Sequence, residues 1–221
     1  MLPLYDENPT RSKPFVTWSL ILINVVIFIW EVSSGSYEQI IIDYGEIPAF
    51  VTQGERFFTL ITSIFLHGDL FHIFGNMLYL FIFGDNIEDR FGHTKFLFLY
   101  LIFGIVGGLA HSYITVIFDG IDAFIPAIGA SGAISGVLGA YLTFFPRARI
   151  VSAVILLYFI RIVRVPALVF IGFWFLLQLL YVLMGSLGGV AYWAHIGGFL
   201  IGFTVGLVAK QIQKFHMGHS P

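Results

Sequence analysis

The sequence of 221 residues contains no cysteine and few charged residues. Without cysteine there is no disulfide framework, no thiol nucleophile and no cysteine-ligated zinc or iron–sulfur site. Only 11% of the residues are Asp, Glu, Lys or Arg, whereas soluble domains contain about 25%. So few charges do not cover the surface of a water-soluble domain. A net charge of −2 and the lack of a basic stripe also argue against a nucleic-acid partner.

Long apolar segments take the place of the missing charges. Hydrophobic residues make up 58% of the chain, and its mean hydropathy is +0.91. A helix that crosses a membrane needs about 20 mostly apolar residues. Six segments meet this requirement approximately: 15–31, 70–87, 95–117, 127–145, 165–184 and 190–209. We therefore expect an all-α integral membrane protein that contains a bundle of six transmembrane helices.

The segments outside these helices are short. Residues 150–163 are apolar but interrupted by Arg161 and Arg164, so we interpret them as a connection in or near the membrane interface. The chain then divides into a short N-terminal segment, a six-helix core and a C-terminal tail: residues 1–14, 15–209 and 210–221. A signal peptide is an alternative for the first apolar segment, because Arg11 and Lys13 precede it. The length of its apolar run and the presence of Asn24 favour a bundle helix instead.

The distribution of Lys and Arg predicts the orientation of the bundle. With six crossings, one side holds both termini and the loops 85–95 and 146–164. That side collects ten of the eleven Lys and Arg residues, and Arg56 lies on the other side. Basic residues are enriched in cytoplasmic loops. We therefore expect both termini in the cytoplasm, in a plasma membrane of a bacterial or archaeal type.

Polar residues inside the apolar segments are costly in lipid, so each is a candidate for function. His72 and Asn76 lie four residues apart near the start of the second segment, on one helix face. Ser131 begins the fourth helix, and His195 lies early in the sixth. These three helices run from outside to inside, which places the polar groups about 5–10 Å below the outer face. A shared depth is unexpected for scattered structural residues and favours one site.

Glycine spacing indicates which helices meet at that depth. The fourth and sixth segments each carry a stripe of glycines on one face: Gly129, Gly132, Gly136 and Gly139, and Gly198, Gly202 and Gly206. Stripes of small residues let helix backbones approach closely in lipid. Such an approach brings the Ser131 hydroxyl and the His195 imidazole within hydrogen-bond reach.

A serine next to an imidazole points to nucleophilic catalysis. The hydroxyl is a weak nucleophile until a base takes its proton, and histidine is the usual base. Ser131 lies at a helix start, where free backbone N–H groups are available; with His72 and Asn76 they could stabilise an oxyanion. The fourth and sixth segments contain no Asp or Glu. We therefore expect a Ser131–His195 dyad, not a triad.

Three motifs together resemble the signature of rhomboid intramembrane serine proteases. They are GASG at 129–132, the run from His67 through His72 to Asn76, and AHIGGFLIG at 194–202. The resemblance covers all six apolar segments, from about residue 15 to 209.

The resemblance implies a role for each matching residue. Ser131 takes the position of the nucleophile and His195 that of the general base. His72, Asn76 and the Ser131 backbone N–H match the oxyanion hole. Residues with a structural role near the site or on the cytoplasmic side are His67, Gly129, Gly132, Gly198, Gly202 and Glu88. The family cleaves transmembrane protein substrates within the lipid bilayer, with water from the outer face and no metal or cofactor.

Two positions depart from the family pattern. Many relatives carry a tyrosine four residues after the nucleophile, which stacks on the catalytic imidazole, and this chain has Ser135 there. A Trp-Arg pair often seen in the first outer loop is not in register; the nearest candidate is Glu55-Arg56. Support for His195 must therefore come from elsewhere.

Other functions account for fewer of these residues. A zinc protease with His67, His72 and His195 as ligands requires an HExxH-type helix, which is absent. A haem held by two histidines leaves Ser131 and Asn76 unexplained. A transporter is expected to show repeated halves, and no two halves of this sequence resemble each other. A catalytically silent relative normally lacks the serine or the histidine, and this chain has both. We assign His93 and His111 to structural roles, and Asn24 and Gln178 to interhelical hydrogen bonds.

Overall fold

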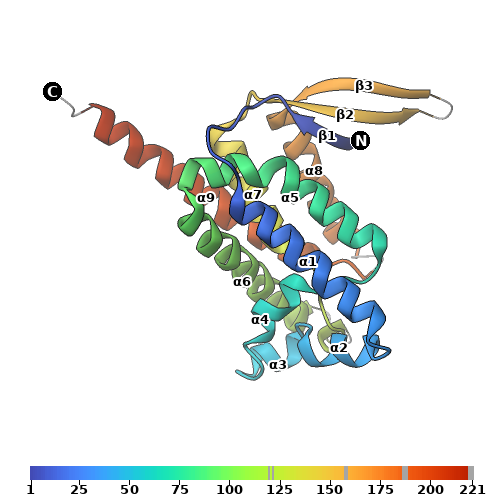
Figure 1. Cartoon of the computed structure of the whole chain (residues 1–221). Coiled ribbons are helices and arrows are strands. Elements are labelled where there is room, and N and C mark those ends of the chain that lie inside the picture. Colours follow the sequence, from blue (N-terminus) through green and yellow to red (C-terminus); the bar gives the residue numbers. More distant parts are fainter. Residues whose placement is uncertain (119, 121, 157–158, 186–188, 219–221) are drawn as a thin grey trace.

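The computed structural model describes residues 1–118, 120, 122–156, 159–185 and 189–218 (Figure 1). The helices within these residues are α1 (Phe15–Ser33), α2 (Tyr37–Tyr44), α3 (Pro48–Thr52), α4 (Thr59–Thr62), α5 (Leu70–Phe91), α6 (His93–Phe118), α7 (Ser131–Phe144), α8 (Ala167–Leu183) and α9 (Tyr192–Gly218). Two 3₁₀ turns are η1 (Ser63–Phe65) and η2 (Asp122–Phe124), and three strands are β1 (Leu2–Asp6), β2 (Arg149–Leu156) and β3 (Phe159–Pro166). The chain is thus mostly helical, as expected.

Helices form at all six apolar segments. Four of them, α1, α5, α6 and α9, are long and apolar enough to cross a membrane. The other two, α7 and α8, are apolar but have only 14 and 17 residues. Local signals fix some of the ends: the Asp69 side chain caps α5 by accepting from the Phe71 and His72 N–H groups, and Gly92 ends it with a φ of +79°. The last helix continues beyond residue 209, to Gly218.

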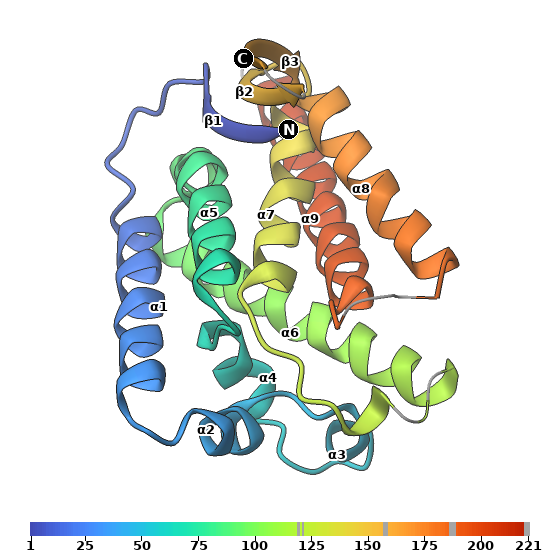
Figure 2. The same cartoon turned by 90° about the vertical axis from the view of Figure 1, so that its right-hand side faces the viewer.

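The helix α7 lies at the centre of the bundle. It stands between α5 and α9, with α1 beyond α5 and α8 beyond α9 (Figure 2). Every residue from 132 to 143 is buried. A Cβ atom on Gly198 or Gly202 would overlap a carbonyl oxygen of α7, so the backbones of α7 and α9 touch along the glycine stripes as expected.

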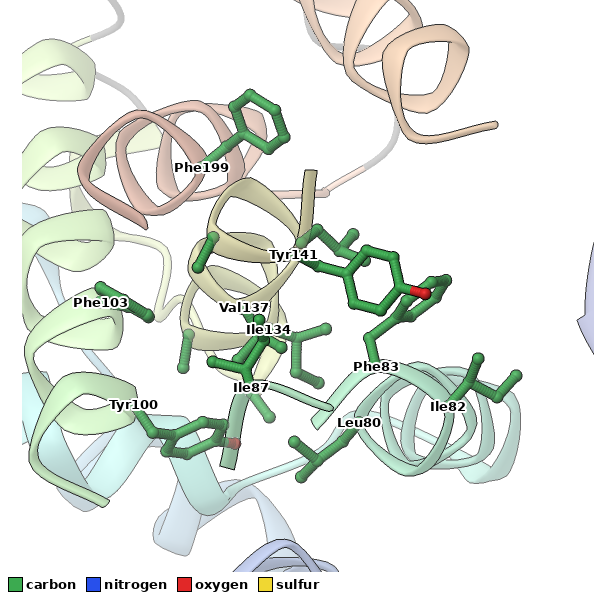
Figure 3. Close-up of a cluster of buried hydrophobic side chains, with 14 of the residues drawn as sticks. Leu80, Ile82, Phe83, Ile87, Tyr100, Phe103, Ile134, Val137, Tyr141 and Phe199 are labelled. Atoms are coloured by element: carbon green, nitrogen blue, oxygen red, sulfur yellow. The ribbon is translucent and has the colours of Figure 1, made fainter. Parts of the chain in front are cut away.

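Apolar side chains from the surrounding helices converge on α7. Figure 3 shows Val137 of α7 between Phe103 of α6 and Leu80 of α5, all fully buried. On the next turn of α7, the Tyr141 ring meets Phe83 edge to face, with 5.0 Å between the ring centroids. Such pairs add specific geometry to apolar packing, and they hold α7 in one rotational setting.

A three-stranded antiparallel sheet covers one end of the bundle, so the expectation of an all-α chain is wrong at this point. The strands lie in the order β1-β2-β3. Residues 150–156 and 159–163, the described part of the predicted connection, lie in two paired strands in which Arg149 pairs with Pro166 and Leu156 with Phe159. Ile150 is fully buried in the helical core cluster. The segment forms strands because one of its faces packs on the helix ends through Ile150 and Val165. The strand β1, from the predicted N-terminal segment 1–14, pairs with the edge of β2 that β3 leaves open.

Asp6 ties β1 to the helices. Its carboxylate accepts hydrogen bonds from the Tyr141 hydroxyl and from Asn86 Nδ2. Burial raises the pKa of Asp6 from 3.8 to about 6, although the bond from Tyr141 opposes this shift. The sheet is thus attached to α5 and α7 by a partly buried acid.

Glu88 fixes the start of α1 at the same end. Its carboxylate accepts from the Val16 N–H, the Thr17 N–H and the Thr17 hydroxyl, at 2.7–2.8 Å, and it pairs with His93 Nδ1. The first N–H groups of a helix lack partners within the helix. The residue before α1, Pro14, provides no side-chain acceptor for these N–H groups. Glu88 of α5 therefore caps the start of α1.

Candidate active site

Ser131 and His195 meet at the contact between α7 and α9. Ser131 is the first residue of α7, and His195 lies in the first turn of α9. The Ser131 Oγ atom is 2.8 Å from His195 Nε2, within hydrogen-bond distance. Two residues 64 positions apart are therefore brought together, as the glycine stripes predict.

Gln178 of α8 determines which ring nitrogen of His195 carries the proton. The Gln178 Nε2 group donates to the Trp174 carbonyl, so its Oε1 atom points toward His195 Nδ1, 2.8 Å away. An amide oxygen only accepts, so Nδ1 of the neutral ring is the protonated nitrogen. The lone pair of Nε2 is then free to accept the Ser131 hydroxyl proton.

Aromatic side chains surround the His195 ring. The Trp174 ring lies 6.1 Å away at 34°, and the Tyr192 ring lies 6.1 Å away at 85°. Ser135, where many relatives have a tyrosine, donates to the Ser131 carbonyl instead. The support expected from elsewhere thus comes from α8 and from the start of α9.

His72 and Asn76 direct two side-chain donors toward the residues before Ser131. The Gly68 N–H donates to His72 Nδ1 at 3.2 Å, so the neutral His72 ring carries its proton on Nε2. This Nε2 atom lies against Gly129, where a Cβ atom would be 2.7 Å from it. Asn76 Nδ2 is buried and has no hydrogen-bond partner among the described residues. A buried donor left unpaired is costly in a resting protein and is what an oxyanion site requires.

His67 lies beside His72 as a neutral ring. Its ring is 5.1 Å from that of His72 at 64°. Burial lowers the pKa of His67 to about 3. Its carbonyl accepts from the Tyr37 hydroxyl, and its N–H lies 3.4 Å from Glu31 Oε2. These contacts attach the start of α5 to α1 and α2.

The segment that leads into Ser131 is held from both sides. Ala127 and Glu46 exchange two backbone hydrogen bonds, and Gly129 N–H donates to the Ser63 carbonyl. The Glu46 carboxyl accepts from Ser112 of α6, and burial raises its pKa to about 7. Gly129 has a φ of +121°, a conformation that favours glycine. The turn before α7 is thus anchored on the loop between α2 and α3.

All four predicted polar residues line one cavity of about 770 Å³. Its wall includes Ser131, His195, His72 and Asn76. His111 of α6 also belongs to the wall, and its Nδ1 atom lies 3.2 Å from Thr115 Oγ1. Sequence reasoning missed His111 as a residue of the site, because an isolated histidine on a long apolar helix carries no spacing signal.

The fold and the site define a helical membrane protein in which a partly buried serine lies against a buried histidine. Residues 54–212 match the rhomboid domain. The chain therefore belongs to the rhomboid family.

Curated relatives come from plants, bacteria and fungi. The chain is 32% identical over 176 residues to RHOMBOID-like protein 1 of Arabidopsis thaliana, which covers 78% of this chain and 40% of the relative. It is 33% identical over 135 residues to Rhomboid protease GluP of Bacillus subtilis, 60% of this chain and 25% of the relative. It is 31% identical over 162 residues to Rhomboid protein 1, mitochondrial, of Saccharomyces cerevisiae, an alignment that covers 71% of this chain and 43% of the relative. The chain thus spans less than half the length of these three proteins.

Proposed function

We propose that this chain is an intramembrane serine endopeptidase that cleaves transmembrane segments of membrane proteins. The observation that carries the proposal is the 2.8 Å contact between Ser131 Oγ and His195 Nε2, with His195 Nδ1 held by Gln178. Nucleophile, base and a third group that orients the base are the parts of an activated serine. Membership of the rhomboid family and the name of the protease from B. subtilis support the same reaction class.

In the first half of the reaction, Ser131 Oγ attacks the scissile carbonyl carbon while His195 Nε2 takes the hydroxyl proton. The carbonyl oxygen becomes an oxyanion next to His72 Nε2–H, Asn76 Nδ2–H and the Ser131 backbone N–H. The C–N bond then breaks, and the imidazolium gives its proton to the leaving amine. An ester between Ser131 and the acyl part of the substrate remains.

In the second half, water takes the place of the amine. His195 Nε2 removes a proton from the water as its oxygen attacks the ester carbonyl. The resulting oxyanion uses the same donors, and collapse expels Ser131 Oγ, which regains its proton from His195. No group beyond the side chains and water is required, so the proposed reaction uses no metal or cofactor.

The proposed setting is a plasma membrane in which six helices cross the bilayer and both termini lie in the cytoplasm. The bias of Lys and Arg toward the side that holds the termini and the loops 85–95 and 146–164 supports this orientation. The cavity then opens toward the outer face, from which water reaches Ser131. The partners of the enzyme are transmembrane substrates and the surrounding lipid.

The test is cleavage of a fluorogenic transmembrane reporter by the purified chain in detergent, together with labelling by a fluorophosphonate. We expect cleavage and labelling in the wild type and neither in Ser131→Ala. The matched control is Ser152→Ala, which removes a buried hydroxyl that has no hydrogen-bond partner among the described residues. Labelling that persists in folded Ser131→Ala would falsify the assignment of the nucleophile. A folded wild type that neither cleaves nor is labelled would refute the protease itself.

A further inference from the structure

The β2–β3 hairpin extends beyond the helices that it covers. Its base is packed on the bundle, where Ile150 is fully buried and its partner Val165 lies against the same core. From there the two strands run sideways, away from the helices (Figure 1). The described residues of β3 farthest from the base are among the most exposed apolar side chains: Phe159 is 74% and Ile160 71% exposed. This half of the hairpin has apolar surface that the chain itself does not bury.

The strand register shows that apolar and basic groups are combined on the hairpin. Directly paired residues lie on one face of a sheet, and faces alternate along a strand. The face that packs through Ile150 and Val165 therefore continues to Arg161 and Phe159 at the free end. The opposite face carries Ile160 there. Arg161 is exposed and has no ion-pair partner among the described residues.

The charge of the hairpin has one sign. Residues 149–166 include Arg149, Arg161 and Arg164 but no Asp or Glu. Arg164 is paired with Glu7 at 2.7 Å, whereas Arg149 and Arg161 have no ion-pair partner among the described residues. Of these two, Arg161 shares the face of Phe159. A guanidinium binds phosphate oxygens in a bidentate manner. An exposed arginine on the same face as the exposed Phe159 suits a membrane interface, where phosphate groups lie next to hydrocarbon.

The surroundings of the hairpin supply such a surface. It leads through Pro166 directly into α8, whose first turn has Leu168 and Val169 more than half exposed. The exposed side chains of α8, an apolar helix, thus continue into the exposed apolar residues of β3. We propose that the β2–β3 hairpin is a lipid-binding element that turns the face with Phe159 and Arg161 toward the membrane, inserting Phe159 into the interface and holding anionic phospholipid headgroups through Arg161. This function is independent of the proposed protease activity.

The first experiment measures the depth of the hairpin in vesicles that contain the full chain. The absence of cysteine allows single nitroxide labels to be attached to Phe159→Cys and to two reference variants. Leu22→Cys lies on the exposed face of α1, and Gln53→Cys lies in the exposed turn after α3. We expect the label at 159 to collide with oxygen, as at 22, and to be protected from a water-soluble nickel complex. A label at 159 that behaves as at 53, or that is shielded from both reagents by a second copy or another protein, overturns the proposal.

The second experiment tests the headgroup. A fluorophore attached to the Phe159→Cys variant, on the same face as Arg161, is quenched by brominated phosphatidylglycerol or brominated phosphatidylcholine, at equal mole fraction in the same mixed vesicles. We expect brominated phosphatidylglycerol to quench more, because one arginine near the surface enriches an anionic lipid about fivefold. Arg161→Gln should lower this preference, whereas Lys214→Gln, which removes a cation from α9, should retain it. Equal quenching by the two lipids in the otherwise unchanged chain refutes the anionic-lipid site.

Discussion

Gln178 offers the sharpest test of how the site is built, because it touches the base and not the substrate bond. Gln178→Leu removes the acceptor for His195 Nδ1–H at 2.8 Å and leaves a buried donor without a partner. Such a loss costs about 1–3 kcal/mol. If this cost falls on the productive orientation of His195, kcat drops about 5- to 150-fold, since about 1.36 kcal/mol corresponds to tenfold.

The assay is steady-state cleavage of a transmembrane reporter, with kcat and KM determined separately. We expect KM to change little, because Gln178 orients the base in the proton transfer. Gln178→Glu keeps an acceptor opposite Nδ1 and should retain more activity than Gln178→Leu. Leu176→Ala, at a 49% exposed position of the same helix, is the control for damage to α8. A folded Gln178→Leu variant with the wild-type kcat would show that the bond does not orient the base.

Three further predictions concern other parts of the molecule. Asn76→Ala should lower kcat about 100- to 1000-fold with little change in KM, as expected for a lost oxyanion donor; an effect on KM alone would assign Asn76 to substrate docking. Gly198→Ala should lower the free energy of unfolding in detergent by about 1–3 kcal/mol, because its Cβ overlaps the Gly132 carbonyl oxygen. Gly132→Ala is the milder matched variant, since its Cβ comes no closer than 3.6 Å to any neighbour in the described chain; equal losses would contradict the contact geometry. The pKa of Asp6 is raised from 3.8 to about 6 in the folded chain, so the native state binds this proton more tightly than the unfolded state does. The stabilisation that protonated Asp6 gives to the folded chain is therefore lost as pH rises from about 4 to about 6. Asp6→Asn should flatten this part of the stability–pH profile in denaturant titrations, and an unchanged slope would mean that another group titrates.

The sequence predicts the helices well because their signals are local. Apolar runs bounded by charge, Pro or Gly locate α1, α5 and α6 within a few residues of the observed ends. The glycine stripes predict the contact between α7 and α9, and shared depth predicts which polar residues meet. These inferences require only the helical rise and the thickness of a membrane.

The features that the sequence did not predict depend on distant partners. The strands β2 and β3 carry apolar residues on both faces, with arginines on both as well, so they show no regular alternation of apolar and polar residues. The strand β1 pairs with β2 across nearly 150 residues. Gln178 was expected to form an interhelical bond, and it does so with His195. Asn24 was expected to form one too, but its Nδ2 donates to the Leu20 carbonyl of the same helix. A buried amide in the sequence predicts that its side chain forms a hydrogen bond, but it does not predict which residue is the partner.

The shortness of α7 has a consequence for how the protein is made. Fourteen residues extend about 21 Å, less than the hydrocarbon thickness of about 30 Å. Its middle is covered by protein on all sides, and its glycines contribute little to partitioning into lipid. Newly synthesised α7 therefore has no stable place in a bilayer on its own, and α9, which packs against it, follows it in the chain. Insertion of the helix that carries Ser131 must wait for its neighbours, so biogenesis joins membrane integration to assembly of the site in one cooperative step.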